Sequence, residues 1–120
     1  MDYIFENDKP IYIQLFEKLR LDIVSGNLKV GEKIPSVREL ALKARVNPNT
    51  MQKALQDLES QGLIYTERTN GKYVTNDLKL VENIKNELAI NKVRKFFNDM
   101  KDIGISYNET IKYINEMEEK

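Results

Sequence analysis

The stretch RVNPNTMQKALQDLESQGLI, residues 45–64, determines how the rest of the chain is interpreted. Asn47 and Pro48 are typical of a helix start, because asparagine caps a free backbone N–H and proline suits the first helical position. Apolar residues then recur at helical spacing: Met51, Leu55 and Leu58. The pattern predicts a helix from Asn47 to about Gln61, ended by Gly62.

The leading end of this helix carries more polar side chains than a cap alone requires: Asn47, Asn49, Thr50, Gln52 and Lys53. Asparagine and glutamine can each bind an adenine edge through two hydrogen bonds, and threonine can contact a thymine methyl group. Taken alone, such a start is more commonly explained by capping. The surroundings favour DNA, because the segment from Ser36 to Lys53 holds four basic residues against one acidic residue.

The composition limits the classes of protein that fit the chain. Its 120 residues suit one domain, or a small domain with an appendage, and 41% hydrophobic with 32% charged residues is ordinary for a soluble helical protein. The formal net charge of +0 argues against nucleic-acid binding only if the whole chain is counted, since phosphate contacts depend on local charge. No stretch approaches the ~20 apolar residues of a membrane span, and no signal peptide is visible, so we expect a cytoplasmic protein without a membrane partner. Cysteine and histidine are both absent. We therefore expect no enzyme, no metal site and no cofactor.

Two more helices are predicted ahead of the opening stretch. Residues 10–25 have a broad apolar face, begin with a proline suited to the first turn and end at Gly26. Ser36 and Glu39 have the S-x-x-E spacing of a capping box, which predicts a short helix over residues 36–44. The connector between these helices is rich in turn-forming residues and has room for one very short strand.

A β-hairpin is predicted behind the opening stretch. Two β-prone runs flank Asn70 and Gly71, a strong signal for a two-residue hairpin turn. The tip also carries Arg68 and Lys72. Only about two residues separate the second and third helices, which forces a sharp crossing of the helix-turn-helix type.

The remaining residues, 78–120, predict a long helix, a break at Gly104 and a short helix behind a second S-x-x-E box at Ser106 and Glu109. Both helices are apolar on one side, and they cannot bury those sides against each other alone. We expect a dimer interface formed by Val81, Ile84, Leu88, Val93, Phe96, Phe97, Met100, Ile111 and Ile114.

Three segments together resemble a known family: GNLKVGEKIPSVRELA, VNPNTMQKALQDLESQGLI and NGKYV. They look like the winged-helix domain of GntR-family bacterial transcription regulators, from about Pro10 to Val74. The segment PIYIQLFEKLRLDIVSG and the VNPNT box resemble the YtrA-like subfamily, whose members end in a two-helix dimerisation tail. The resemblance implies a mainly α fold with a small β-hairpin wing. It also implies a winged helix-turn-helix DNA-binding domain over residues 1–77 and a helical dimerisation tail over residues 78–120.

The resemblance implies a role for each matching position. Ser36 and Arg38 would bind backbone phosphate, and the recognition helix would face the groove with Asn47, Asn49, Thr50 and Gln52. Lys53 would lie beside that surface as a phosphate contact. In the wing, Gly71 would allow a close approach to the minor groove, with Lys72 nearby. The protein would be a homodimeric repressor on a pseudo-palindromic double-stranded operator, controlling a transporter operon and its own gene. An effector is not indicated by any residue.

The sequence departs from the family at three positions. Arg45 stands where the turn commonly has glycine, so a positive φ there would carry strain. Glu67 replaces a residue that is often basic, and Thr69 replaces a common glycine, which weakens the expectation for the wing. Two alternatives remain open: a winged helix that binds a protein instead of specific DNA, and an enzyme that uses carboxylates.

Overall fold

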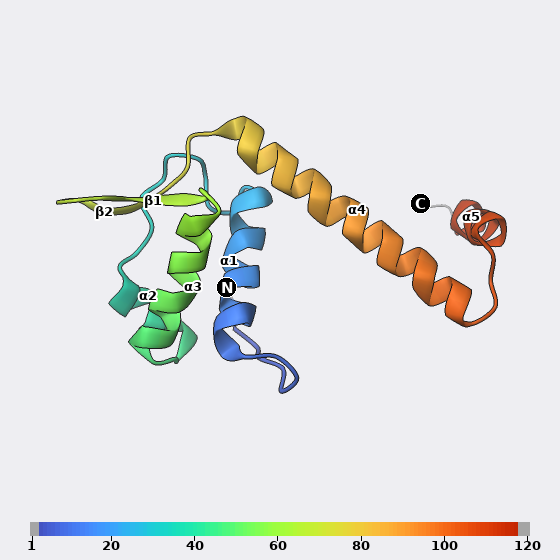
Figure 1. Ribbon diagram of the computed structural model, residues 1–120, viewed down its shortest axis with the longest axis horizontal. Coiled ribbons are helices and arrows are strands. Elements are labelled where there is room, and N and C mark those ends of the chain that lie inside the picture. Colours follow the sequence, from blue (N-terminus) through green and yellow to red (C-terminus); the bar gives the residue numbers. More distant parts are fainter. Residues whose placement is uncertain (1–2, 118–120) are drawn as a thin grey trace. The chain divides into compact units, whose positions relative to one another are not determined.

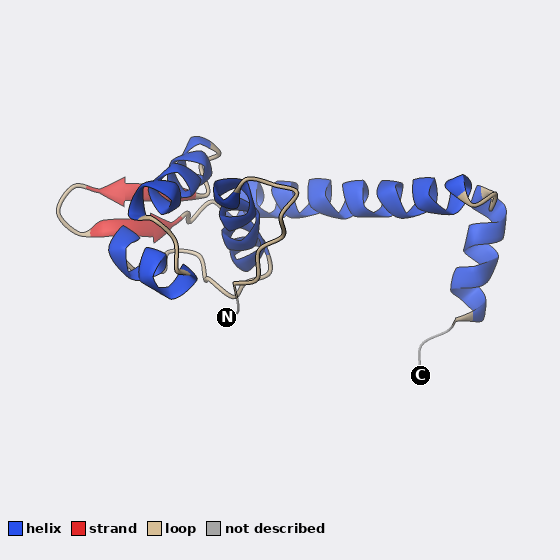
Figure 2. Cartoon of the chain, turned by 90° about the horizontal axis from the view of Figure 1, so that it is seen from below, coloured by secondary structure: helices blue, strands red, loops and turns tan. Residues whose placement is uncertain are grey.

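The computed structural model describes residues 3–117. Along the chain its elements are α1 (Ile11–Val24), α2 (Val37–Ala44), α3 (Pro48–Ser60), β1 (Ile64–Glu67), β2 (Gly71–Val74), α4 (Leu78–Asp102) and α5 (Tyr107–Glu116) (Figure 1). They divide into two compact units, a first unit that ends at Ile84 and a second unit that begins at Lys85. The predicted fold class is confirmed: three helices and a two-stranded wing, followed by C-terminal helices (Figure 2).

The first two helices begin at local signals that the sequence contains. Pro10 lies one position before α1, and its carbonyl accepts from the N–H groups of Ile13 and Gln14 at 3.2 and 3.3 Å. The predicted capping box opens α2, where the Ser36 N–H donates to the Glu39 carboxylate at 3.0 Å and the Glu39 N–H donates to the Ser36 hydroxyl at 3.1 Å. Each start therefore satisfies backbone groups that would otherwise lack partners.

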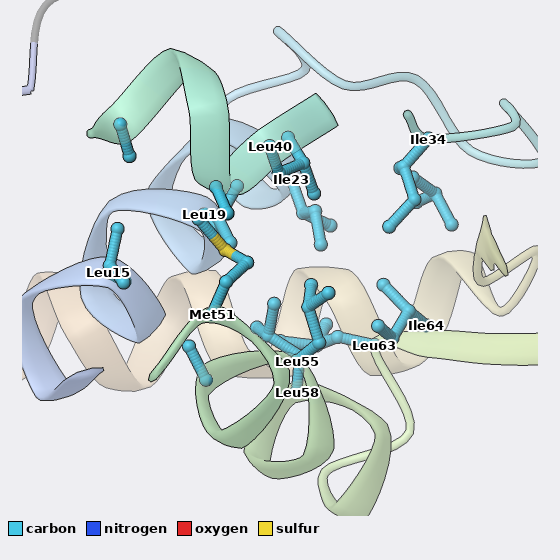
Figure 3. Packing of buried hydrophobic residues seen from close by; sticks show 14 residues of the cluster. Leu15, Leu19, Ile23, Ile34, Leu40, Met51, Leu55, Leu58, Leu63 and Ile64 are labelled. Atoms are coloured by element: carbon cyan, nitrogen blue, oxygen red, sulfur yellow. The ribbon is translucent and has the colours of Figure 1, made fainter. Parts of the chain in front are cut away.

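The core of the first unit forms where α1, α2, α3 and the wing meet (Figure 3). Its buried apolar side chains are Leu15, Leu19, Ile23, Ile34, Leu40, Ala41, Ala44, Met51, Ala54, Leu55, Leu58, Leu63, Ile64 and Val74. Met51, Ala54 and Leu55 are all 0% exposed. Since one whole side of α3 is taken up by this core, its remaining side chains must face outward.

The wing is a two-stranded antiparallel sheet extended by the connector ahead of α2. Ile64 pairs with Val74, and Glu67 pairs with Gly71 next to the turn. The very short strand that the connector could hold is an isolated bridge between Lys33 and Tyr73. The Ile34 N–H reinforces it by donating to the Lys72 carbonyl at 3.0 Å. The connector is thereby fixed along the outer edge of β2.

In the second unit, the first residues of α5 contact the C-terminal part of α4. The predicted capping box is present, with the Ser106 N–H donating to the Glu109 carboxylate at 2.9 Å. Thr110 is 1% exposed, and its hydroxyl donates to the Ser106 carbonyl at 2.8 Å. The rings of Phe97 and Tyr107 lie 4.8 Å apart between centroids. None of the helices described over residues 3–117 is both long and apolar enough to cross a membrane.

Two residues that the sequence assigns to the dimer interface also contact the core of the first unit. Val81 and Ile84 are partly buried against the core of the first unit. The helical periodicity of residues 78–100 identifies an apolar face without saying what covers it, and the first turns of α4 are covered by the first unit. Val81 and Ile84 are therefore partly covered within a single copy of the chain, and their place in the dimer interface stays a prediction.

The turn between α2 and α3 places a non-glycine residue in the left-handed region. Arg45 has φ 59° and ψ 48°, and among residues 3–117 no other residue besides glycines has a positive φ. Side chains with a Cβ pay roughly 1–2 kcal/mol for this conformation. The strain that the sequence comparison anticipated at this position is present.

Replacing Arg45 with glycine is expected to raise the free energy of unfolding by up to about 1 kcal/mol, because glycine adopts this conformation without strain but loses more entropy on folding. Thermal or denaturant unfolding of the protein without DNA measures the change. Arg45→Ala is the matched control, because it removes the charge and keeps the Cβ. If Arg45→Ala stabilises as much as Arg45→Gly, the gain does not come from relieved backbone strain.

Candidate nucleic-acid interface

The leading end of α3 is exposed, as its polar sequence predicts. Asn47 caps the helix, and its side-chain oxygen accepts from the Asn49 N–H at 2.7 Å. Asn47 and Asn49 are exposed, while Thr50 and Gln52 are half-buried. Because the Asn47 oxygen is used in capping, its amide nitrogen is the group it can still offer to a ligand. The helix end thus presents several donors and acceptors together with free backbone N–H groups.

The start of α2 supplies two more of the predicted residues. The pKa of Glu39 lies below its usual value, chiefly because its carboxylate accepts hydrogen bonds from the backbone and side chain of Ser36. Glu39 is therefore ionised and occupied within the capping box. Arg38 follows Ser36 at the exposed start of the helix and forms no ion pair with any residue between 3 and 117. Its guanidinium is available for phosphate.

Lys53 is held partly against α1. Its ammonium lies 4.5 Å from the centroid of the Tyr12 ring, a cation–π contact, while the residue itself is exposed. The contact directs the lysine toward the side of α3 that packs on α1. The sequence contains both residues, but their spacing of more than forty positions gives no signal of this contact.

The four residues predicted to bind DNA from the wing all lie in one hairpin, but their side chains point in different directions. Arg68 is exposed in the turn, and the Asn70 amide donates to the Glu67 carboxylate at 3.3 Å. Gly71 has φ 111°, a conformation in which a side chain would be strained. Lys72 instead turns toward α3: its ammonium donates to the Thr66 hydroxyl of β1 at 2.8 Å and lies 3.5 Å from the Glu59 carboxylate of α3.

The structure adds one residue that the sequence analysis omits. Lys33 is exposed, and its Cε lies 3.3 Å from the point where a Cβ on Gly71 would stand. The lysine therefore lies next to the turn of the wing although it comes from the connector. The short strand predicted in the connector was the only signal that Lys33 could lie beside the wing. The sequence alone does not say which strand this segment would pair with.

The predicted DNA-binding residues from α2, α3 and the wing all belong to the first unit. Within residues 3–117, no three His, Cys, Asp or Glu side chains gather in a way that could hold a metal ion. What the surface offers is amide, hydroxyl and backbone hydrogen bonding with cations beside it. That combination can bind phosphates and base edges.

Comparison with known proteins shows the family of the chain. Residues 11–74, more than half of the sequence, match the family described as "Bacterial regulatory proteins, gntR family". The chain belongs to the gntR family.

Two relatives match over almost the whole length of the chain. The chain is 33% identical over 114 residues to the uncharacterised HTH-type transcriptional regulator YhcF of Bacillus subtilis, with 95% of this chain and 94% of the relative covered. It is 34% identical over 110 residues to the HTH-type transcriptional repressor YtrA of the same species, with 90% and 84% covered. The expected YtrA-like relationship is confirmed.

Solved structures agree with this placement. A GntR family transcriptional regulator from Listeria monocytogenes matches with a TM-score of 0.87 and 38% identity, covering 95% of this chain and 100% of the other. The DNA-binding domain of AraR in complex with operator ORX1 matches with a TM-score of 0.58 and 31% identity, covering 62% and 96%. This gntR-family chain is a transcription regulator that binds specific DNA.

Proposed function

We propose that this gntR-family regulator is a homodimeric repressor that acts in the cytoplasm on a pseudo-palindromic operator. The observation that carries the proposal is the division of α3. Its apolar side is fully buried, and its polar leading end is exposed. A helix held in this way can enter a major groove end-on while the rest of the first unit contacts the backbone.

We propose a division of labour among the exposed residues. Asn49, Thr50 and Gln52 contact base edges, and Asn47 combines its capping role with a contact from its amide nitrogen. Ser36, Arg38 and Lys53 contact phosphate and set the position of the helix in the groove. Arg68, Asn70 and Gly71 place the wing at the neighbouring minor groove. A good bidentate contact discriminates between bases by about 1–3 kcal/mol.

We propose that the second unit joins two copies of the chain. Its apolar side chains include several that are markedly exposed: Ile90 at 55%, Val93 at 53%, Phe96 at 43% and Ile114 at 46%. The proposed interface also includes Val81, Ile84, Leu88, Phe97, Met100 and Ile111, which are half-buried. Exposed apolar side chains gathered on one helical unit favour association with a second copy. We place the division between the DNA-binding head and this tail after Ile84 and not at Asp77, because Val81 and Ile84 pack on the head.

Relatives support the repressor assignment, since the YtrA protein of Bacillus subtilis is named a repressor. We propose control of a transporter operon and of the regulator's own gene as the biological role. Binding and not catalysis is the proposed activity, because the chain contains no cysteine or histidine.

The proposed function is tested by selecting binding sites from a random pool of duplex DNA. The expected result is enrichment of one sequence with two related half-sites, bound with an affinity that falls steeply as salt rises. Recovery of unrelated sequences, or an affinity indifferent to salt, would contradict specific binding through the proposed surface. A sequence with a single half-site would contradict the dimer.

A further inference from the structure

The two lysines near the wing lie on opposite faces of its sheet. Thr66 pairs directly with Lys72, on the same face as the buried pair Ile64 and Val74. Opposed residues of an antiparallel pair share a face, and alternate residues share it along a strand. Lys72 therefore belongs to the inner face of the wing, the face that packs on the core.

Hydrogen bonds and charge keep Lys72 on that face. Its ammonium lies 3.5 Å from the carboxylate of Glu59 in α3, and its side chain is only 17% exposed. The Thr66 hydroxyl, which accepts from this ammonium at 2.8 Å, donates to the same Glu59 carboxylate at 3.1 Å. The three side chains link both strands of the wing to the recognition helix. The neighbouring carboxylate offsets the positive charge of this ammonium, so its attraction for a phosphate is weak.

Lys33 lies on the other face of the wing and, among the described residues, has no acidic partner there. It bridges to Tyr73, whose neighbour across the hairpin is Tyr65, and the two tyrosine rings stack at 5.7 Å. This face lies on the other side of the sheet from Lys72. The stem of Lys33 passes over Gly71, and within residues 3–117 its ammonium has no carboxylate within ion-pair distance. Lys33 precedes Ser36 by three positions, so the same short segment leads from the wing to the start of α2.

We infer that Lys33 is the cation with which the wing binds phosphate, and that Lys72 together with Glu59 and Thr66 ties the wing to α3. The inference rests on the proposed function, in which the wing lies against DNA. The glycine at residue 71 is required first by its φ of 111°, which strains any side chain. A Cβ there would also stand 3.3 Å from the Lys33 Cε, so the end of the lysine would have to shift slightly.

The salt dependence of operator affinity tests the inference in the full-length protein. A lost phosphate contact reduces the slope of log affinity against log salt by about 0.9 per bound subunit. We expect Lys33→Gln to flatten the slope by this amount and Lys72→Gln to keep the wild-type slope. The two variants are matched, because each removes one lysine charge from the same wing. Thermal melting of each variant shows that the head remains folded.

If Lys72→Gln also flattens the slope, Glu59→Gln distinguishes between two roles for Lys72. Lys72 could tie the wing to α3, or it could contact phosphate itself. A loosened wing would lose the Lys33 contact, so Glu59→Gln must then flatten the slope as Lys72→Gln does, and this result supports the inference. A wild-type slope for Glu59→Gln, beside a flattened slope for Lys72→Gln, overturns it. An unchanged slope for Lys33→Gln overturns it as well. Failure of the wild-type protein to select a sequence would instead refute the proposed function, which makes the two failures distinguishable.

Discussion

Replacing Val93 with glutamate is expected to convert the dimer into monomers and to weaken operator binding by about 10²–10⁴-fold, the range lost when two linked binding events become separate. Val93 is 53% exposed in the second unit, so the substitution leaves a single copy of the chain folded. In a dimer the carboxylate would be buried among apolar side chains without a partner, which is strongly unfavourable. Sedimentation equilibrium measures the association, and titration of the selected operator measures the affinity.

Asn91→Glu is the control for this prediction. It adds the same carboxylate two residues away, on the opposite side of α4, where Asn91 is exposed. We expect this variant to remain dimeric and to bind within a few-fold of wild type. A dimeric Val93→Glu protein would show that the interface lies elsewhere, and equal losses in both variants would point to the added charge and not to its place.

Replacing Leu55 with alanine is expected to lower the free energy of unfolding by about 2–5 kcal/mol. Leu55 is 0% exposed at the centre of the core, on the buried side of the recognition helix (Figure 3). It also lines a largely apolar recess of about 270 Å³, together with residues such as Ile23 and Leu40. Removing the leucine side chain enlarges a space that its neighbours already fail to fill, so little relaxation can compensate. Denaturant unfolding followed by circular dichroism measures the loss.

Leu42→Ala is the matched control, because the same atoms are removed from an α2 residue that is 72% exposed. We expect it to change stability by no more than about 0.5 kcal/mol. The Leu55→Ala protein should also bind DNA weakly at temperatures where it is partly unfolded. Near-equal effects of the two substitutions would mean that α3 is not anchored through Leu55.

The parts of the fold that depend on neighbouring residues could be predicted from the sequence. The capping boxes at Ser36 and Ser106 and the start of α3 at Pro48 all involve residues within a few positions of one another. Their chemistry is local, so the pattern of residue types is enough to specify them. The hairpin is also present, but the predicted two-residue turn at Asn70 and Gly71 is wrong: Glu67 pairs with Gly71, so residues 68–70 form the turn and Gly71 begins β2. The unusual residue in the turn before α3, Arg45, was identified differently, from the family resemblance, because the family commonly has glycine there.

Contacts between distant segments could not be predicted in this way. Lys72 pairs with Glu59, Lys53 lies over Tyr12, and Lys33 crosses Gly71. In each case the distance along the chain between the two residues matches no helical or strand period. The family resemblance gives the role of a position in the fold, but not which side chain a given residue contacts. The alternation of a strand could have placed Lys72 on the inner face, because Val74 lies two positions away on the same face and is clearly apolar.

The exposed leading end of α3 is expected to read base pairs directly. The direct measurement is the affinity of wild-type and Gln52→Ala proteins for the selected operator and for each of its single-base variants. We predict that Gln52→Ala loses about 1–3 kcal/mol of base preference at one position in each half-site and keeps the wild-type preference elsewhere. An unchanged preference at every position, or an equal loss for all sequences, would contradict the claim.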